Sequence, residues 1–238
     1  MLIQSMLKYL CISICLLFCS VDLLALPTND TVDIAKPKEQ YGHQICVGVD
    51  IFQPFISSTV NYRTGYEFTA DYYFKNDVYF VVEAGWGDAN INYPDLVYKS
   101  TNNFFRIGIN KSLFARLSPK DWDMGFVGLR YGFASIQRSN ATYTVIDSFW
   151  GNTTGSVPAQ ELNCHWVELS GGMRVELFKG ICAGYTIRGK FRLNNNDFQL
   201  LAPVYIAGYG RGDKNSVFDF NLYISYAIRW KRKGDSPH

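Results

Sequence analysis

The stretch Phe218-Asp-Phe-Asn-Leu-Tyr-Ile-Ser-Tyr-Ala-Ile-Arg-Trp230 decides the fold class of this 238-residue chain. Every second residue from Phe218 to Trp230 is large and apolar, whereas most residues between them are polar or charged. Successive side chains of a β-strand point to opposite faces, so a period of two predicts a strand with one apolar face. At about 3.4 Å per residue, the seven apolar residues would cover more than ~20 Å of strand.

The same alternation recurs in seven earlier segments. Their apolar faces are carried by Val47–Ile51, Tyr66–Phe74, Phe80–Trp86, Phe105–Ile109, Val127–Phe133, Val167–Leu177 and Ala183–Leu193. After the N-terminal apolar run there is no second apolar run of helix length, which excludes a helical membrane protein. The pattern predicts an all-β chain that forms an eight-stranded antiparallel up-and-down transmembrane β-barrel.

The expected connections differ in length at the two ends of this barrel. Tight turns are predicted at residues 75–77 and 178–180, and a modest connection at residues 112–121. Longer loops are predicted at residues 88–102, 138–161 and 194–216, with a short exception near residues 61–64. Short turns at one end and long loops at the other are typical of an outer-membrane barrel.

The polar face of the predicted strands carries nearly balanced charges. Its acids are Asp50, Glu67, Asp71, Glu83, Glu168, Glu176 and Asp219, and its bases are Arg106, Arg130, Arg174, Arg188, Lys190 and Arg192. An eight-stranded barrel is just wide enough for side chains to fill its interior, where unpaired charges would be costly. We therefore expect an ion-pair network in a closed lumen and lipid outside. The alternative is a soluble, secreted, lipocalin-like ligand-binding barrel whose charges face water.

Aromatic residues make up 16% of the chain. Tyr and Trp are enriched where a membrane protein meets the headgroups. We expect Trp86, Tyr131 and Phe133 near the outer interface, and Phe74 and Trp230 near the inner one.

The two chain ends are read as segments outside the barrel. Residues 1–25 resemble a signal peptide, with Lys8 before the apolar run Tyr9–Phe18 and cleavage expected after Ala25. An uncleaved anchor, or a lipoprotein modified at Cys19, are the alternatives. Residues 26–44 are expected to form a polar periplasmic lead-in, residues 45–230 the barrel, and residues 231–238 a polar periplasmic tail.

Motifs that would indicate chemistry are weak. A net charge of +2 gives no reason to expect nucleic acid. Cys46, Cys164 and Cys182 are too widely spaced for a disulfide framework or a metal site, so no metal or cofactor is expected. Arg211-Gly-Asp213 and the glycines at positions 208, 210 and 212 are interpreted as turns. His165 could act as a base with Glu161 or a loop serine, which leaves a lipid-acting outer-membrane enzyme as an alternative function.

Several motifs carry a family resemblance. They are Arg63–Asp71, Phe126–Phe133, His165–Glu176, Tyr205–Gly210 and Phe218–Tyr226. In their order they resemble an uncharacterised Bacteroidota family of outer-membrane barrels, domain-of-unknown-function family 6048. The resemblance implies a Bacteroidota source and an envelope location, and it supplies no activity and no catalytic residues. Ala207 departs from the proline expected in relatives at this loop position.

The expected function is that of a structural or surface-interaction protein in the bacterial outer membrane. Its expected partners are outer-membrane lipid, the barrel-assembly machinery and an unknown surface or envelope partner. Functional residues concentrate on loops held by a rigid scaffold. The surface partner is therefore expected to contact the loops at 88–102, 138–161 and 194–216.

Overall fold

A computed structural model of the chain describes residues 43–114, 122–147, 149, 151–194, 198 and 201–230. Its elements are β1 (His43–Asp50), α2 (Phe52–Thr59), β2 (Arg63–Lys75), β3 (Val78–Asn92), β4 (Leu96–Ser112), β5 (Met124–Arg138), β6 (Ala141–Val145), β7 (Thr153–Val157), β8 (Gln160–Phe178), β9 (Ile181–Arg192) and β10 (Ser216–Trp230). The predicted signal peptide, most of the lead-in and the C-terminal tail lie outside the described residues. The first strand starts at His43, two residues before the predicted barrel boundary.

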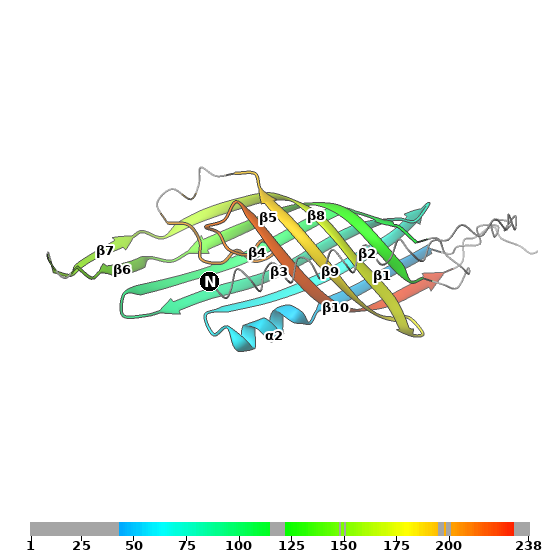
Figure 1. The fold of residues 1–238 in the computed structure, drawn as a ribbon, viewed down its shortest axis with the longest axis horizontal. Coiled ribbons are helices and arrows are strands. Elements are labelled where there is room, and N and C mark those ends of the chain that lie inside the picture. The colour runs from blue at the N-terminus through cyan, green and yellow to red at the C-terminus, as the bar shows by residue number, and fades with distance from the viewer. Residues whose placement is uncertain are drawn as a thin grey trace, which may run out of the picture. The chain divides into compact units, whose positions relative to one another are not determined.

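Eight of these strands close into an antiparallel barrel (Figure 1). Around the ring, each strand pairs with the next in the order β1, β2, β3, β4, β5, β8, β9 and β10. The last strand then pairs with the first, with Val47 opposite Tyr226. The prediction of an all-β, eight-stranded, antiparallel barrel is confirmed.

One end of the barrel, here called the turn end, holds the first residue of β1 and the last residue of β10. The β2–β3 turn at this end consists of Asn76 and Asp77, both with positive φ, at 51° and 58°. Two successive residues with positive φ form a turn whose twist matches that of the flanking strands, and Asn and Asp tolerate this conformation. Gly180, with φ of 84°, serves the β8–β9 turn at the same end.

The opposite end, here called the loop end, differs from the sequence prediction. The predicted loop at 88–102 is a hairpin, because β3 continues to Asn92 and β4 begins at Leu96. In this hairpin Asp88, Asn90 and Thr101 are exposed, whereas Ile91 and Tyr98 are buried. The period of two therefore persists, but most outward residues here are polar and the inward face is mixed, with Ser100 and Asn102 also buried. The search for strands relied on an apolar outward face, which this hairpin lacks.

The predicted loop at 138–161 also contains strands. β6 and β7 form a hairpin, and β6 joins the sheet where its Tyr143 pairs with Leu96 of β4. In Figure 1 this hairpin extends beyond the barrel wall in the same direction as the β3–β4 hairpin. The sheet thus continues past the barrel on this side.

The helix α2 replaces the short connection predicted near residues 61–64. β1 ends at Asp50, while β2 and β10 continue toward the loop end, and α2 packs against both of them. Asp50 Oδ1 accepts the amides of Phe52 and Gln53 at 2.6 and 3.3 Å, which satisfies the helix N-terminus. Ser57 Oγ accepts the amide of Gly65 on β2 at 3.2 Å. Beyond the end of β1, β2 and β10 therefore contact α2 instead of pairing with β1.

Candidate functional site

The two faces of the barrel wall have opposite polarity. The inward positions hold charged side chains that are almost fully buried, among them Arg106 and Glu168 at 0% exposure. The outward positions hold large apolar side chains such as Ile107, Leu129 and Ile187, each more than half exposed. The candidate functional site is therefore the charged lumen.

A cluster of three glutamates and three arginines lies at the centre of this lumen. Arg106 is ion-paired to Glu67, to Glu83 at 2.7 Å and to Glu168 at 3.3 Å. Arg188 reaches the same three carboxylates at 2.9, 3.1 and 3.4 Å. Arg130 contacts Glu168 at 3.2 Å and Glu83 at 3.5 Å.

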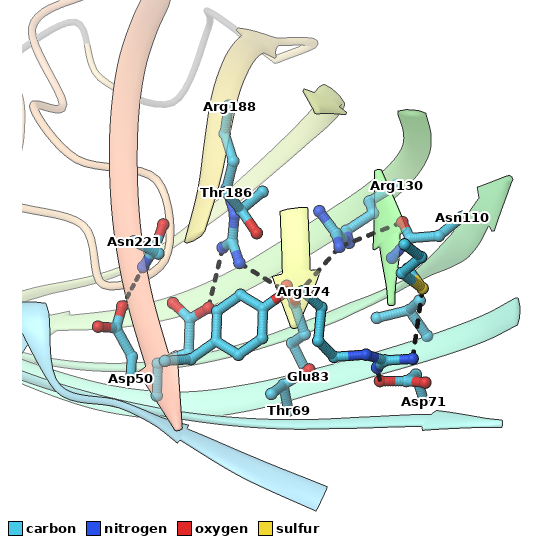
Figure 2. A pocket seen from close by; sticks show the side chains of 14 residues that line it. Asp50, Thr69, Asp71, Glu83, Asn110, Arg130, Arg174, Thr186, Arg188 and Asn221 are labelled. Atoms are coloured by element: carbon cyan, nitrogen blue, oxygen red, sulfur yellow. Dashed lines mark hydrogen bonds and ion pairs between the residues drawn. The ribbon is translucent and has the colours of Figure 1, made fainter. Parts of the chain in front are cut away.

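The contacts of Arg188 with Glu67 and Glu83 cross the lumen, whereas Arg106–Glu83 and Arg130–Glu168 join neighbouring strands. Glu67 and Glu83 belong to β2 and β3, whereas Arg130 and Arg188 belong to β5 and β9. Figure 2 shows Arg130 and Arg188 extending from one side of the lumen, and Asp50 and Glu83 from the other. A planar guanidinium can bond several carboxylates at once, which suits arginine to a buried network of this kind. The equal numbers of acids and bases keep the six-residue cluster neutral.

Three further ion pairs surround the cluster. Arg174 contacts Asp71 at 2.5 Å, and Lys190 contacts Asp219 at 2.5 Å. At the turn end, Arg229 contacts Glu176 at 2.6 Å, and both side chains are partly exposed. Partly exposed ion pairs usually contribute little to the free energy of unfolding. Breaking a buried pair of the central cluster costs more, because it leaves a buried charge without its partner.

Two of the predicted lumen residues have a different role. Asp50 bonds the side-chain amide of Asn221 and the start of α2. Arg192 lies over the Phe198 ring at 4.7 Å and donates to the Gly212 carbonyl and to Asn215 Oδ1. These two charged residues anchor segments of the loop end to the lumen.

Arg63, Arg138 and Arg229 also lie at inward positions but were not among the predicted site residues; Arg63 lies over the Tyr205 ring at 5.1 Å. Arg229 lies on the polar face of β10, so its period already indicated an inward position. Arg138 lies eight residues after Arg130 on β5 and is buried, with its guanidinium donating to the carbonyls of Leu201 and Pro158 at 2.7 and 3.2 Å. Strict alternation along β5 would have identified Arg138 as well.

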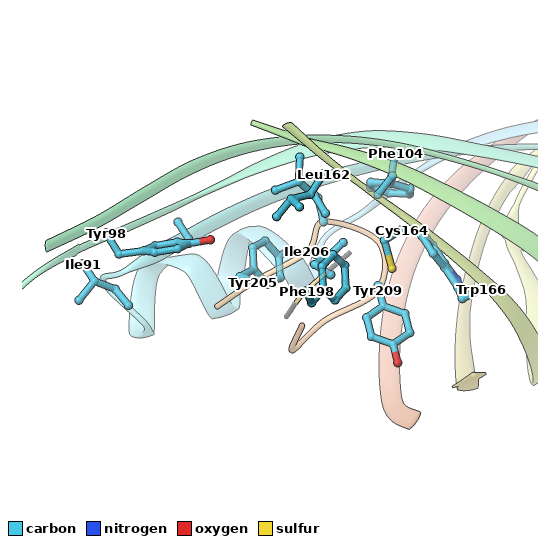
Figure 3. Close-up of a cluster of buried hydrophobic side chains, with 14 of the residues drawn as sticks. Ile91, Tyr98, Phe104, Leu162, Cys164, Trp166, Phe198, Tyr205, Ile206 and Tyr209 are labelled. Carbon is cyan, nitrogen blue, oxygen red and sulfur yellow. The ribbon is translucent and has the colours of Figure 1, made fainter. Parts of the chain in front are cut away.

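The segment at 201–215 fills the lumen at the loop end, and is called the plug here. Tyr205, Ile206 and Tyr209 are buried among inward side chains of the barrel, including Phe104 and Trp166 (Figure 3). This segment belongs to the predicted surface loop 194–216. A surface position is wrong for Tyr205, Ile206 and Tyr209, whereas Arg211, Asp213 and Lys214 are exposed. The first three side chains are buried in the barrel interior and not displayed to a partner.

The plug is also bonded to the charged cluster. The Gly208 carbonyl accepts from Arg106 Nη1 at 3.2 Å and from Lys190 Nζ at 2.8 Å. Gly208 has a φ of +76°, and a Cβ atom there would lie 2.5 Å from the Phe104 ring. The position requires glycine for both its backbone conformation and its close approach to β4.

We expect Gly208→Ala to loosen the plug. A left-handed conformation costs an L-residue about 1–2 kcal/mol, and the contact with Phe104 adds to this cost. Hydrogen exchange of the amides at 201–215 should become at least about tenfold faster, because 1.4 kcal/mol corresponds to a factor of ten. Gly151→Ala is the matched control, because Gly151 has a φ of +79° and no atom within 4 Å of a Cβ. Unchanged exchange in the plug of Gly208→Ala would contradict this role.

The five predicted interface aromatics all lie on outward positions of the wall. Phe74 lies beside the β2–β3 turn and Trp230 ends β10, where its ring stacks on His43 at 5.7 Å. Trp86 packs on Tyr66 and Phe68. Tyr131 and Phe133 flank His165 on the outside of β5 and β8.

The structure does not assemble the predicted base around His165. His165 Nδ1 is bonded to the Tyr131 hydroxyl at 2.6 Å, and its backbone amide donates to Asn194 Oδ1 at 2.9 Å. Glu161 lies four residues away on the same strand β8, a separation of about 13 Å. That distance is far beyond hydrogen-bond reach, so the proposed pair with Glu161 is wrong.

Other candidate chemistry is limited within the part of the chain that the structure describes. Cys46, Cys164 and Cys182 are buried free thiols. The described residues contain no group of three or more His, Cys, Asp or Glu side chains suited to a metal ion. Among them, no helix has the length and apolar character needed to cross a membrane. Arg211 and Asp213 pair with each other at 2.7 Å, and this bond holds the pKa of Asp213 below its usual range.

Comparison with known families now identifies the chain. The model of one family, described as Domain of unknown function (DUF6048), matches residues 5–233. The chain belongs to the DUF6048 family. This match confirms, over nearly the whole chain, the family resemblance found in the sequence motifs.

Comparison with individual proteins adds little to this family assignment. None of the curated proteins matches the sequence. Among solved structures, this DUF6048 chain is similar to the N-terminal β-barrel domain of Pseudomonas aeruginosa OprF, with 12% identity and a TM-score of 0.34. The match covers 79% of this chain and 98% of that one.

Proposed function

We propose that this protein spans a bacterial outer membrane as a closed barrel and acts as a structural or surface-interaction protein of the envelope. The observation that carries the proposal is the opposite polarity of the two wall faces. Soluble monomers rarely expose contiguous apolar patches larger than a few hundred Å². Here large apolar side chains stand at outward positions of all eight barrel strands, as a lipid environment requires.

The alternative of a lipocalin-like soluble barrel requires the reverse arrangement. A ligand-binding barrel of that kind has an apolar interior and a polar exterior. In this barrel the middle of the interior holds Glu67, Glu83, Glu168 and their arginine partners. The ion pairs and the plug together fill the lumen, which favours a closed barrel over an open pore.

The loop end offers the surfaces for an interaction partner. The tip of the β3–β4 hairpin exposes Tyr93, and the β6–β7 connection exposes Ile146 and Phe149, the latter at 92%. These apolar side chains lie on connections at the end of the barrel where the sheet continues past the wall. We propose that the partner contacts these two hairpins.

Epitope tags on intact cells test the location and orientation. A tag inserted after Gly151, in the β6–β7 connection, should be stained from outside, because the loop end faces the medium. The matched control is a tag after His238, since β10 ends at the turn end and the tail should lie in the periplasm. Both tagged proteins should fractionate with the outer membrane and show heat-modifiable mobility. Recovery in the soluble fraction, or reversed staining, would overturn the proposal.

A further inference from the structure

An apolar groove crosses the outward face of the barrel over β5, β8 and β9. Its volume is about 480 Å³. It is lined by Val127, Leu169, Ser170, Gly171, Gly172, Tyr185, Ile187, Gly189, Phe191 and Phe218. Ser170 and the Tyr185 hydroxyl supply the only side-chain oxygens of this lining. The groove therefore suits a hydrocarbon occupant.

Two glycines at outward positions create the hollow. Gly171 and Gly189 occupy outward positions of β8 and β9, where the other outward residues are mostly large and apolar. Gly189 is paired with Leu169, and Gly171 with Ile187, so the two glycines are diagonal neighbours on adjacent strands. Phe218, which is 83% exposed on β10, stands opposite Gly189 at the edge of the groove.

Neither glycine is required by the backbone. Both have an ordinary negative φ, and the β8–β9 pairing is continuous from Trp166 to Glu176. A Cβ atom at Gly171 would approach only the Phe126 carbonyl, at 3.6 Å, and one at Gly189 would come no closer than 3.5 Å to any atom. By contrast, a Cβ at Gly172 would lie 2.1 Å from the Tyr185 carbonyl. Glycine weakens a strand interior and often marks the close approach of a ligand.

We propose that this groove holds one acyl chain of an outer-membrane lipid. The proposal rests on the membrane location proposed above. From Tyr185 to Phe191 the groove follows about 20 Å of strand. With the usual tilt of 35–45°, this span covers about 15 Å along the membrane normal, or one leaflet of a ~30 Å hydrocarbon core.

A second copy of the chain fits the groove poorly. A two-fold interface brings the same patch of each subunit together. The two grooves would then face each other and leave an enlarged void, whose lining would lose dispersion contacts. A flexible acyl chain can instead follow the curved floor between Leu169, Ile187 and Phe218.

The test fills the groove with side chains. Gly171→Leu/Gly189→Leu places two leucines where space exists, so the barrel should fold normally. The matched control is Ala70→Leu/Ala84→Leu, which adds leucines at diagonal outward positions of β2 and β3, outside the groove. Each detergent-purified protein is loaded with phosphatidylethanolamine that carries a diazirine in one acyl chain. Native mass spectrometry then counts retained lipid, and photocrosslinking maps its position.

The wild-type protein and the control variant should retain one lipid, with crosslinks on residues 185–191. The groove-filled variant should retain at least about tenfold less lipid and lose those crosslinks. Equal retention by a folded groove-filled variant would overturn the proposal, as would a lipid-free wild-type protein or a dimer. Heat-modifiable mobility of the wild-type protein in detergent reports the membrane barrel separately. A failed groove can thereby be distinguished from a failed membrane location.

Discussion

Replacing Glu168 with glutamine should destabilise the barrel by about 3–5 kcal/mol, the usual range for removing one partner of a buried ion pair. Glu168 is fully buried and contacts Arg106, Arg130 and Arg188 at 3.2 to 3.4 Å. Glutamine keeps the shape but removes the charge, which leaves three arginines facing the two remaining glutamates of the cluster. Taking charge out of water without compensation is the source of the penalty.

Urea unfolding in lipid vesicles, followed by tryptophan fluorescence, measures this change. Glu176→Gln is the matched control, since its partner Arg229 is partly exposed and the loss should be at most about 1 kcal/mol. Removing a base as well, in Glu168→Leu/Arg130→Met, should restore part of the lost stability, because apolar replacement of a buried pair is often tolerated. If the free energy of unfolding of Glu168→Gln stays within about 1 kcal/mol of the wild-type value, the ion pairs of Glu168 do not stabilise the lumen as described.

The period of two identified all eight barrel strands but not their full length. The search relied on an apolar outward face, which holds for Ile107 and Leu129 in the middle of the wall. Toward the loop end the outward face becomes polar, as at Asp88 and Thr101, because the sheet continues beyond the apolar belt. The sequence predicts strands well only where the outward face of the wall is apolar. The same limit explains why the β3–β4 hairpin was predicted as a loop.

The sequence predicts on which face of its strand each site residue lies, but not which residues it contacts. Alternation indicates that Arg106 and Arg188 point inward. Arg106 reaches Glu83 because the two residues are paired on the neighbouring strands β3 and β4, whereas only the closed barrel brings Arg188 on β9 to Glu67 and Glu83. The contribution of Gly208 was not predictable, because its bond to the cluster is made by a main-chain carbonyl. The helix α2 was also missed, since its formation depends on β1 ending before its neighbours do.

Replacing Ile224 with lysine should impair barrel stability and assembly. Ile224 lies on the outward face of β10, between Val49 on β1 and Ala183 on β9, and is half exposed. A lysine facing the hydrocarbon near the bilayer midplane costs about 2–4 kcal/mol, and the cost falls toward the interfaces. The free energy of unfolding in vesicles should fall by a similar amount. In cells, the heat-modifiable band should weaken.

Two comparisons separate this effect from a general intolerance of change. Thr101→Lys places the same charge on the outward face of β4, where the hairpin already exposes Lys99, and should cost no more than about 1 kcal/mol. Deleting residues 231–238, which follow the terminal aromatic Trp230, should leave assembly intact if the strand itself is the insertion signal. If Ile224→Lys is stable and Thr101→Lys is defective, the lipid surrounds the barrel at the level of Thr101 and not at the level of Ile224. That result would contradict the membrane position described here. Equal effects of both lysines would instead show that charge anywhere on the outward face is excluded, so that the polar hairpin also lies within hydrocarbon.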